Sequence, residues 1–259
     1  MGFRQVGLPG SDSVFGTHRR RTVATVLGRQ RSPSEVVSGL QQALGEDGDT
    51  IVVCDLRGMA APGATVEQMF TPVSHYLDNW PGAAVVVCSE DGSVLTRLPD
   101  GAQRRLLARA DSDTGVSEMA HTLPPVRQAR LRLPADPSAA REAREFATHA
   151  LQRWDVPNAV GTATLVVSEL VTNSIRHAQT VNELTVSLAD GRLRIAVHDL
   201  ENSTPEPSRH FDADALDGRG LFLVEVMSRT WGVFPSTLAG KTVWSILDTA
   251  PERAEQRLS

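Results

Sequence analysis

The chain has 259 residues, which is long for one compact domain and sufficient for two. With 41% hydrophobic residues, 22% charged residues and a mean hydropathy of −0.18, its composition is typical of a soluble protein. The net charge of −5 argues against a nucleic-acid-binding protein. We interpret the basic cluster His18-Arg19-Arg20-Arg21 as a solvated arm.

No segment has the features of a membrane span or of a signal peptide. The longest apolar run, 83–88, is far shorter than the ~20 residues that cross a bilayer. Residues 1–17 lack the basic start and apolar middle of a secretion signal. Cys54 and Cys88 each lie in an apolar run, which is typical of buried thiols in a reducing compartment. We therefore expect a cytoplasmic protein that contacts neither membranes nor nucleic acid.

The first half of the chain alternates helical and strand patterns. Residues 1–19 show no periodicity and are expected to be a flexible tail, and residues 20–122 a smaller α/β domain. Helical patterns are followed by continuous apolar runs, in the order 34–44, 51–54, 66–80 and 83–88. Such alternation predicts a sheet that helices cover on at least one face.

Residues 123–250 are expected to form a second domain, and residues 251–259 a tail. Its expected elements are a short strand at 126–133, helices from Asp136 to Trp154 and from Pro157 to Ala178, strands at 184–188 and 193–197, a helix at 221–227, and strands at 231–234 and 242–247. Asp190-Gly191 between two alternating runs predicts a β-hairpin. Together they predict an α/β sandwich, a mixed sheet with helices on one face.

Polar side chains recur at helical spacing within the second helix of this domain. Glu169, Asn173 and His177 follow one another at intervals of four and therefore lie along one stripe. Apolar neighbours leave little of the helix free for water: Val166, Val167, Leu170 and Val171. A functional stripe is therefore favoured over a solvated face.

Three further segments follow this stripe along the chain. Asp199 stands at the end of a strand, where its carboxylate can accept a hydrogen bond from an amine such as that of adenine or simply start a turn. Gly218-Arg219-Gly220-Leu221 leads into a helix, whose N-terminal N–H groups can bind phosphate. Gly240-Lys241-Thr242-Val243-Trp244 leads into the last strand.

In this order the four segments resemble the sequence boxes of the Bergerat-fold (GHKL) ATPases, and most closely the anti-sigma-factor serine kinases. The resemblance covers about residues 130–247. It implies ATP and Mg²⁺ as cofactors, with Asn173 as the metal ligand and Glu169 as the general base that orients the attacking hydroxyl. It also implies that Asp199 holds the adenine amine with support from Thr242. The remaining expected phosphate contacts are Gly218, Arg219, Gly220 and Leu221, and His177 is assigned to packing.

Residues 52–58, Val-Val-Cys-Asp-Leu-Arg-Gly, resemble the STAS fold of anti-sigma-factor antagonists, which are the usual substrates of these kinases. The phosphorylated Asp-Ser-Ser-Gly segment of those proteins corresponds here to Gly63-Ala64-Thr65-Val66, so most of the acceptor motif is absent. We interpret Thr65 as a helix N-cap. A first domain of this kind on a short linker, 123–135, could occupy the partner surface of the second domain and inhibit it.

The resemblance implies a regulatory serine/threonine protein kinase that phosphorylates a STAS-type antagonist. The alternative is a nucleotide-gated binding module without turnover that sequesters a sigma factor or an antagonist. Glu169 favours the kinase, whereas Glu201, where the family usually carries a small residue, favours the module. The partner and the oligomeric state, including a homodimer, stay open.

Overall fold

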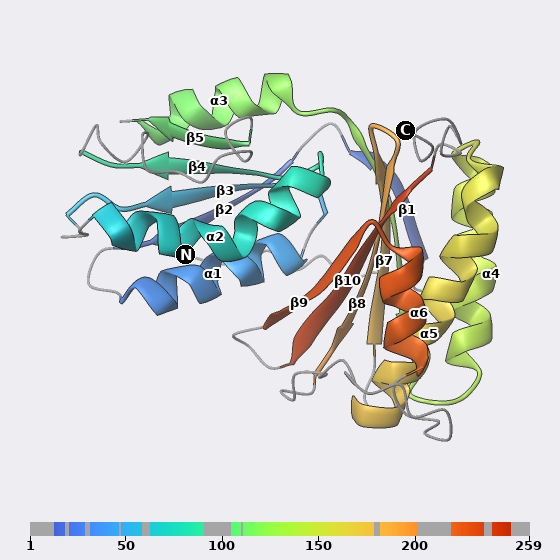
Figure 1. Cartoon of the computed structure of the whole chain (residues 1–259). Coiled ribbons are helices and arrows are strands. Elements are labelled where there is room, and N and C mark those ends of the chain that lie inside the picture. Colours follow the sequence, from blue (N-terminus) through green and yellow to red (C-terminus); the bar gives the residue numbers. More distant parts are fainter. Residues whose placement is uncertain are drawn as a thin grey trace, which may run out of the picture.

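The computed structural model of the chain contains two sheets, each with its own helices (Figure 1). The residues that it describes are 13–18, 21–28, 32–46, 48–58, 63–90, 105–109, 111–178, 182–200, 219–235 and 240–249. None of the helices in these ranges is long and apolar enough to cross a membrane.

The C-terminal half is built on a six-stranded sheet with the strand order β1-β6-β7-β8-β10-β9. Its strands are β1 (Ser13–His18), β6 (Val126–Leu133), β7 (Asn182–Ala189), β8 (Arg192–Asp199), β9 (Thr230–Pro235) and β10 (Lys241–Asp248). All described pairings are antiparallel, where the sequence had led us to expect a mixed sheet. The predicted hairpin of β7 and β8 is confirmed, and the positive φ angles of Asp190 (45°) and Gly191 (70°) fit a type I′ turn.

Three α-helices cover one face of this sheet (Figure 1). They are α4 (Ala139–Arg153), α5 (Val160–Ala178), which a short 3-10 helix at Pro157–Ala159 precedes, and α6 (Arg219–Met227). These positions confirm the helices predicted here, although α4 begins slightly later than expected. Its N-cap is Ser138, whose N–H donates to Asp136 Oδ1 at 2.7 Å.

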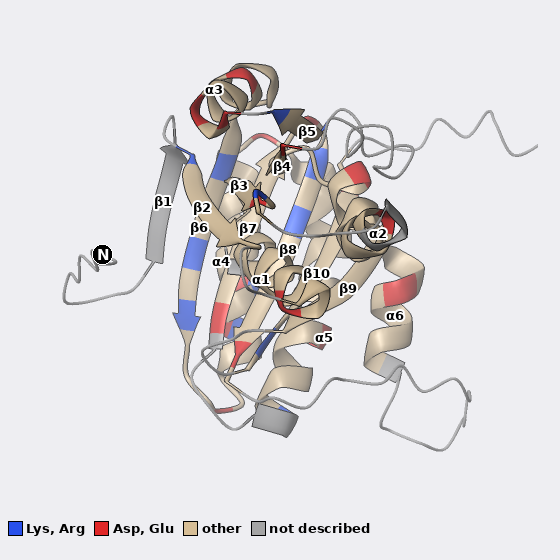
Figure 2. Ribbon diagram, turned by 90° about the vertical axis from the view of Figure 1, so that its left-hand side faces the viewer, with Lys and Arg blue, Asp and Glu red and all other residues tan. Residues whose placement is uncertain are grey.

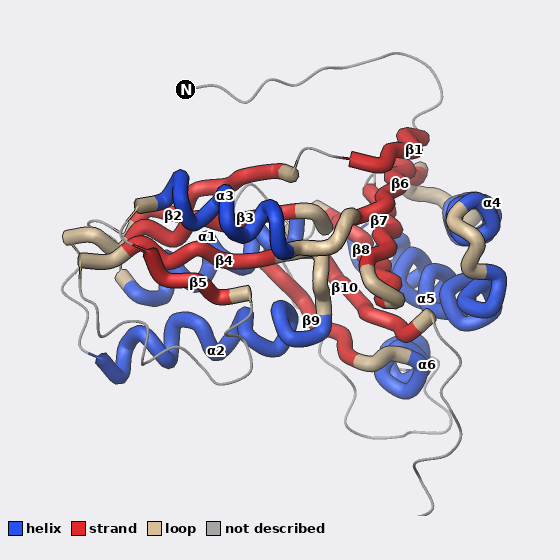
Figure 3. Tube along the Cα trace, turned by 90° about the horizontal axis from the view of Figure 1, so that it is seen from above, coloured by secondary structure: helices blue, strands red, loops and turns tan. Residues whose placement is uncertain are grey.

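The N-terminal half contains a parallel four-stranded sheet with the order β2-β3-β4-β5. Its elements are β2 (Thr22–Leu27), α1 (Pro33–Glu46), β3 (Thr50–Asp55), α2 (Gly63–Asn79), β4 (Ala84–Cys88), β5 (Leu106–Arg109) and α3 (Ser112–Thr122). Helices α1 and α2 pack on one face of the sheet and α3 on the other (Figure 3). The sequence predicted α1, β3, α2 and β4, but not β2, β5 and α3.

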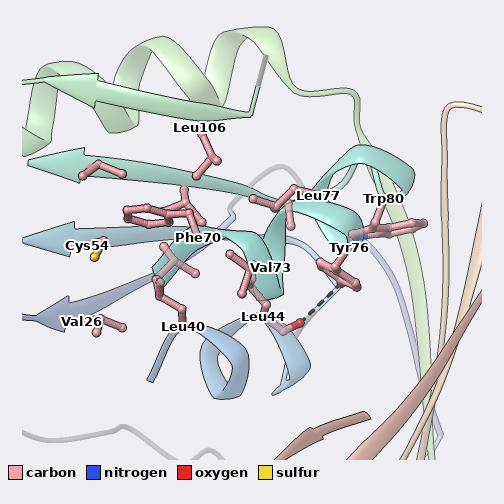
Figure 4. Packing of buried hydrophobic residues seen from close by; sticks show 14 of the residues in the cluster. Val26, Leu40, Leu44, Cys54, Phe70, Val73, Tyr76, Leu77, Trp80 and Leu106 are labelled. Atoms are coloured by element: carbon pink, nitrogen blue, oxygen red, sulfur yellow. Dashed lines mark hydrogen bonds between the residues drawn. The ribbon is translucent and has the colours of Figure 1, made fainter. Parts of the chain in front are cut away.

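Both cysteines are buried, as the sequence predicted, but their side chains lie on opposite faces of this sheet. Cys54 belongs to the cluster under α1 and α2, together with Leu40, Phe70 and Tyr76 (Figure 4). Burial raises the pKa of Cys54 to about 12, so its thiol stays protonated near neutral pH. Cys88 packs beneath α3.

The N-terminal half is an insertion between two neighbouring strands of the six-stranded sheet. β1 pairs with β6 along its whole length, from Ser13 opposite Leu131 to His18 opposite Val126, and residues 19–125 come between them in the chain. The expected tail thus contains a strand, and the expected linker contains β6. Pairing at a sheet edge uses backbone groups, which explains why the sequence of residues 13–18 gave no clear signal.

Arg21 links the two segments that connect this insertion to the six-stranded sheet. Its guanidinium, whose side chain is 10% exposed, donates to Asp49 Oδ1 at 2.5 Å, to the Gly82 carbonyl at 3.0 Å and to the Pro124 carbonyl. Arg21 enters β2 and Pro124 leads into β6, so one side chain holds the entry and the exit of the insertion together. A guanidinium group suits such a junction because it is planar and can donate several hydrogen bonds at once.

The two halves share a continuous core on the sheet face opposite α4, α5 and α6. Tyr76 of α2 packs edge-on against Phe234 and Trp244, with ring centroids 5.1 Å and 4.9 Å apart. The fully buried Arg194 of β8 donates from Nη2 to the Gly45 carbonyl at 3.0 Å, near the C-terminus of α1. A cation there complements the negative end of the helix dipole. The N-terminal half is therefore a packed layer of the fold.

Opposite charges face one another across β6 and β7. Basic residues lie along β6, as Figure 2 shows. Two of them pair loosely with Glu183 of the neighbouring β7: Arg130 at 3.7 Å and Arg132 at 3.9 Å. Exposed ion pairs of this kind contribute little to stability.

Candidate functional site

Glu169 and Asn173 lie one turn apart on α5, as predicted, and α6 packs beside this part of the helix. The Glu169 carboxylate lies against Gly220 in the first turn of α6: a Cβ at Gly220 would be only 2.6 Å from Glu169 Oε2. The space that a side chain at Gly220 would fill is occupied by this carboxylate. The positive end of the α6 dipole also favours a negative group at this place.

Asp199 ends β8 on the same, helix-covered face of the sheet. Its carboxylate is almost inaccessible, with 1% exposure of the side chain, and Oδ2 accepts a hydrogen bond of 3.2 Å from Ser174 of α5. Oδ1 lies 3.4 Å from Nζ of Lys241, the first residue of β10. A buried acceptor at a strand end is thus present where the sequence predicted one.

Gly240 allows β10 to approach the end of β8. Its φ angle of +92° is in the region that favours glycine, and a Cβ there would lie 1.8 Å from the Asp199 carbonyl oxygen. No other residue fits without moving one of the two strands. Gly240, directly before β10, therefore fixes how closely the backbone at Asp199 is approached.

Thr242 does not join Asp199. In the antiparallel register Lys241 is opposite Asp199 and Thr242 is opposite His198, so the two pairs point to opposite faces of the sheet. Thr242 Oγ1 lies 3.3 Å from His198 Nδ1. Gly45 of α1 approaches Thr242 on this face, where an added Cβ would lie 3.6 Å from the Thr242 Cβ. The expected support of Asp199 by Thr242 therefore disagrees with the strand register.

Several expected site residues cannot be placed in full. Gly218 and Glu201 lie outside the described residues, and only the backbone position of Arg219 and His177 within their helices is described. Leu221 is 9% exposed and packs in the core beneath α6, so its side chain faces away from any phosphate. Its backbone N–H remains the group that the phosphate prediction concerns.

Lys241 and Ser174 are the two site residues that the sequence analysis missed. Ser174 follows Asn173 and points to Asp199 from the adjacent position on α5. Lys241 could have been found from the alternation of β10, because Val243 and Leu247 lie on the same face and belong to the same core. To predict that Lys241 pairs with Asp199, one must also know the register between β8 and β10, which the sequence alone does not give.

Replacing Gly220 by Ala is expected to displace the Glu169 carboxylate while leaving the fold intact, because a flexible side chain can move away from the added methyl group. We expect a stability change of about 1 kcal/mol or less and a loss of any activity that depends on the position of Glu169. Thermal unfolding and a phosphotransfer assay measure the two effects. Wild-type activity in Gly220→Ala would contradict this close contact.

Residues 133–245 match the family model described as "Histidine kinase-like ATPase domain". The C-terminal half of the chain therefore carries a domain of this family, and the sheet with helices on one face is its Bergerat fold. This confirms the fold that the four sequence segments predicted.

No curated protein matches the chain. Among solved structures it is similar to the RsbU and RsbW domains of Rv1364c from Mycobacterium tuberculosis, with 19% identity and a TM-score of 0.37. The match covers 48% of this chain and 32% of that one, so this chain spans about a third of that protein. A similarity of this extent says nothing about function.

Proposed function

We propose that the C-terminal half binds ATP with Mg²⁺ and serves a regulatory role. One observation carries this proposal: a buried strand-end carboxylate, Asp199, and the polar stripe of Glu169 and Asn173 lie on the same face of the sheet, beside the first turn of α6. A nucleotide site requires three elements: an acceptor for the base, an oxygen ligand for the metal, and helix N–H groups for the phosphates.

The residues fit a nucleotide with its metal in two respects. Mg²⁺ keeps several waters and needs few protein ligands, so one side-chain oxygen, that of Asn173, together with phosphate oxygens is sufficient. Among the described residues no three His, Cys, Asp or Glu side chains gather into a metal site, and a site of this kind needs none. The Glu169 carboxylate fills the space beside Gly220 in the first turn of α6, so phosphate would bind to the N–H groups of this turn next to that carboxylate.

In this proposal each residue acts through its position. Asn173 orients the metal, Asp199 accepts from the purine amine, and the N–H groups of the segment 218–221 hold the phosphates. Glu169 receives the proton of an attacking hydroxyl group, and ATP supplies the phosphoryl group for transfer. Phosphoryl transfer depends mainly on positioning and charge neutralisation, so one carboxylate next to the metal ligand is sufficient.

The finer part of the proposal is a serine/threonine kinase that acts on a STAS-type antagonist. A parallel sheet with α1 and α2 on one face and α3 on the other supports an α/β fold of this kind in the N-terminal half. This half is not proposed as the acceptor, because residues 63–66 lack most of the acceptor motif. Thr65 is not the N-cap that the sequence suggested either, since α2 begins at Gly63.

Asn173→Ala is expected to weaken Mg-ATP binding about a hundredfold or more, because it removes the proposed protein ligand of the metal. Titration calorimetry of the intact chain measures the affinity with Mg²⁺ and with EDTA. Thr164→Ala on the same helix is a matched control, because its hydroxyl donates to the Val160 and Gly161 carbonyls of α5 and nine residues separate it from Asn173, which places it on the opposite side of the helix. Unchanged Mg-ATP affinity in a folded Asn173→Ala protein would disprove the assignment, and no binding by the wild type would disprove the function.

A further inference from the structure

Lys241 is placed beside Asp199 by the backbone, not by chance rotation of a surface side chain. Lys241 and Asp199 are direct partners in the register of β8 and β10, and Gly240 holds the two strand ends in close contact. The Nζ–Oδ1 distance is 3.4 Å, and the two side chains are 6% and 1% exposed. Both lie on the helix-covered face of the sheet, next to Ser174.

Lys241 begins a line of buried residues along β10. The next two residues of β10 on the same face, Val243 and Ser245, are buried with 4% and 0% exposure, and Leu247 follows. An apolar residue would continue this core, and replacing a buried ion pair by apolar residues is often neutral or stabilising. A buried Lys–Asp pair is therefore better explained by binding than by stability.

We propose that Lys241 is a base-recognition residue of the nucleotide site, and this rests on the proposed function. The edge of adenine presents a donor, the 6-amino group, next to an acceptor, the ring nitrogen N1. Asp199 and Lys241 present an acceptor next to a donor, which is the complementary order. The Lys241 ammonium donates to N1 while it holds the carboxylate that accepts from the 6-amino group. Thr242 cannot take this part, because it lies on the opposite face.

The test compares two nucleotides in the intact chain, ATP and 1-deaza-ATP, in which a C–H group replaces N1. Calorimetry with Mg²⁺ gives both affinities for the wild type, Lys241→Met and Lys241→Arg. The wild type is expected to bind ATP about tenfold or more tightly than 1-deaza-ATP, as loss of a charge-assisted hydrogen bond implies. Lys241→Met is expected to bind both nucleotides equally within about twofold, and Lys241→Arg to regain part of the difference.

The wild-type comparison needs no variant, so the proposal is testable even if Lys241→Met fails to fold. Equal affinities of the wild type for the two nucleotides would overturn it. Tighter ATP binding by Lys241→Met than by the wild type would also overturn it, because the lysine would then merely occupy Asp199. So would a Lys241→Met protein that still prefers ATP over 1-deaza-ATP as strongly as the wild type, because the N1 contact would then lie elsewhere. If the folded wild type binds neither nucleotide, the proposed function fails and this proposal with it.

Discussion

Glu169→Gln is expected to lower the rate of phosphotransfer by about 10²–10⁴-fold, while the affinity for Mg-ATP stays within a few-fold of the wild type. Glutamine has nearly the same size as glutamate and can occupy the space against Gly220, but it cannot receive a proton. The carboxylate acts on the attacking hydroxyl and not on the bound phosphates, so the rate and the affinity separate. Transfer of radiolabel from [γ-³²P]ATP to STAS proteins of the same organism measures the rate, and calorimetry measures the affinity.

The comparison also decides between the two functions that the sequence left open. If the wild type transfers phosphate and Glu169→Gln does not, the chain is a kinase. If both proteins bind Mg-ATP and neither labels any STAS protein, the nucleotide-gated binding module is correct. Equal transfer by both proteins would show that Glu169 is not the base. Glu145→Gln on the exposed face of α4 is a control for nonspecific effects of charge removal.

The sequence was most informative where structure depends on neighbouring residues. The stripe on α5 follows from a period of 3.6 residues, and the hairpin of β7 and β8 from strict alternation and an Asp-Gly turn. Asp199 could be placed at a strand end for the same reason. These elements carry most of the candidate site, which explains why its outline was predictable.

Features that depend on pairing between distant segments were not predictable in the same way. β1 joins β6 across more than a hundred residues, and the partner of Asp199 depends on the register between β8 and β10. α3 carries Gly115 in its first half, where an added Cβ would lie 2.4 Å from Val86 Cγ1. A glycine that allows close packing weakens the local helix signal while it stabilises the tertiary contact.

The insertion also changes how the two halves can be related. The hypothesis of inhibition in cis assumed one short tether, so that the first domain could dissociate from the second. The N-terminal half is instead connected at both ends, through β2 and β6, and Arg21 holds these connections together. It covers the sheet face that Thr242 and Trp244 share, while Asp199 and Lys241 point to the other face. In the described residues it therefore lies behind the site and not over it.

A shortened chain without residues 19–125 is expected to lose the monomeric, cooperatively folding state. His18 and Val126 are direct partners in the β1–β6 pair, so Asn-Gly can join them as a two-residue hairpin turn. The deletion exposes the sheet face that the N-terminal half covers: Val126, Ala189, Ala196, Phe234, Trp244 and Ile246. Each large apolar side chain that loses its cover forfeits about 1.5–3 kcal/mol, and a contiguous apolar face promotes association. Light scattering after size-exclusion chromatography and thermal unfolding measure the two losses.

The matched control is the same shortened chain with Phe234→Thr, Trp244→Thr and Ile246→Thr, which keeps residues that suit a strand but makes the exposed face polar. This protein is expected to be monomeric and to bind Mg-ATP with the affinity of the intact chain, because the substituted residues lie on the face opposite Asp199. If the shortened chain with its native face is already monomeric and unfolds as cooperatively as the intact protein, the N-terminal half is not a required layer of the fold. If the resurfaced chain binds Mg-ATP at least tenfold more tightly than the intact one, the N-terminal half restrains the nucleotide site, and inhibition in cis acts through the sheet instead of by covering the site.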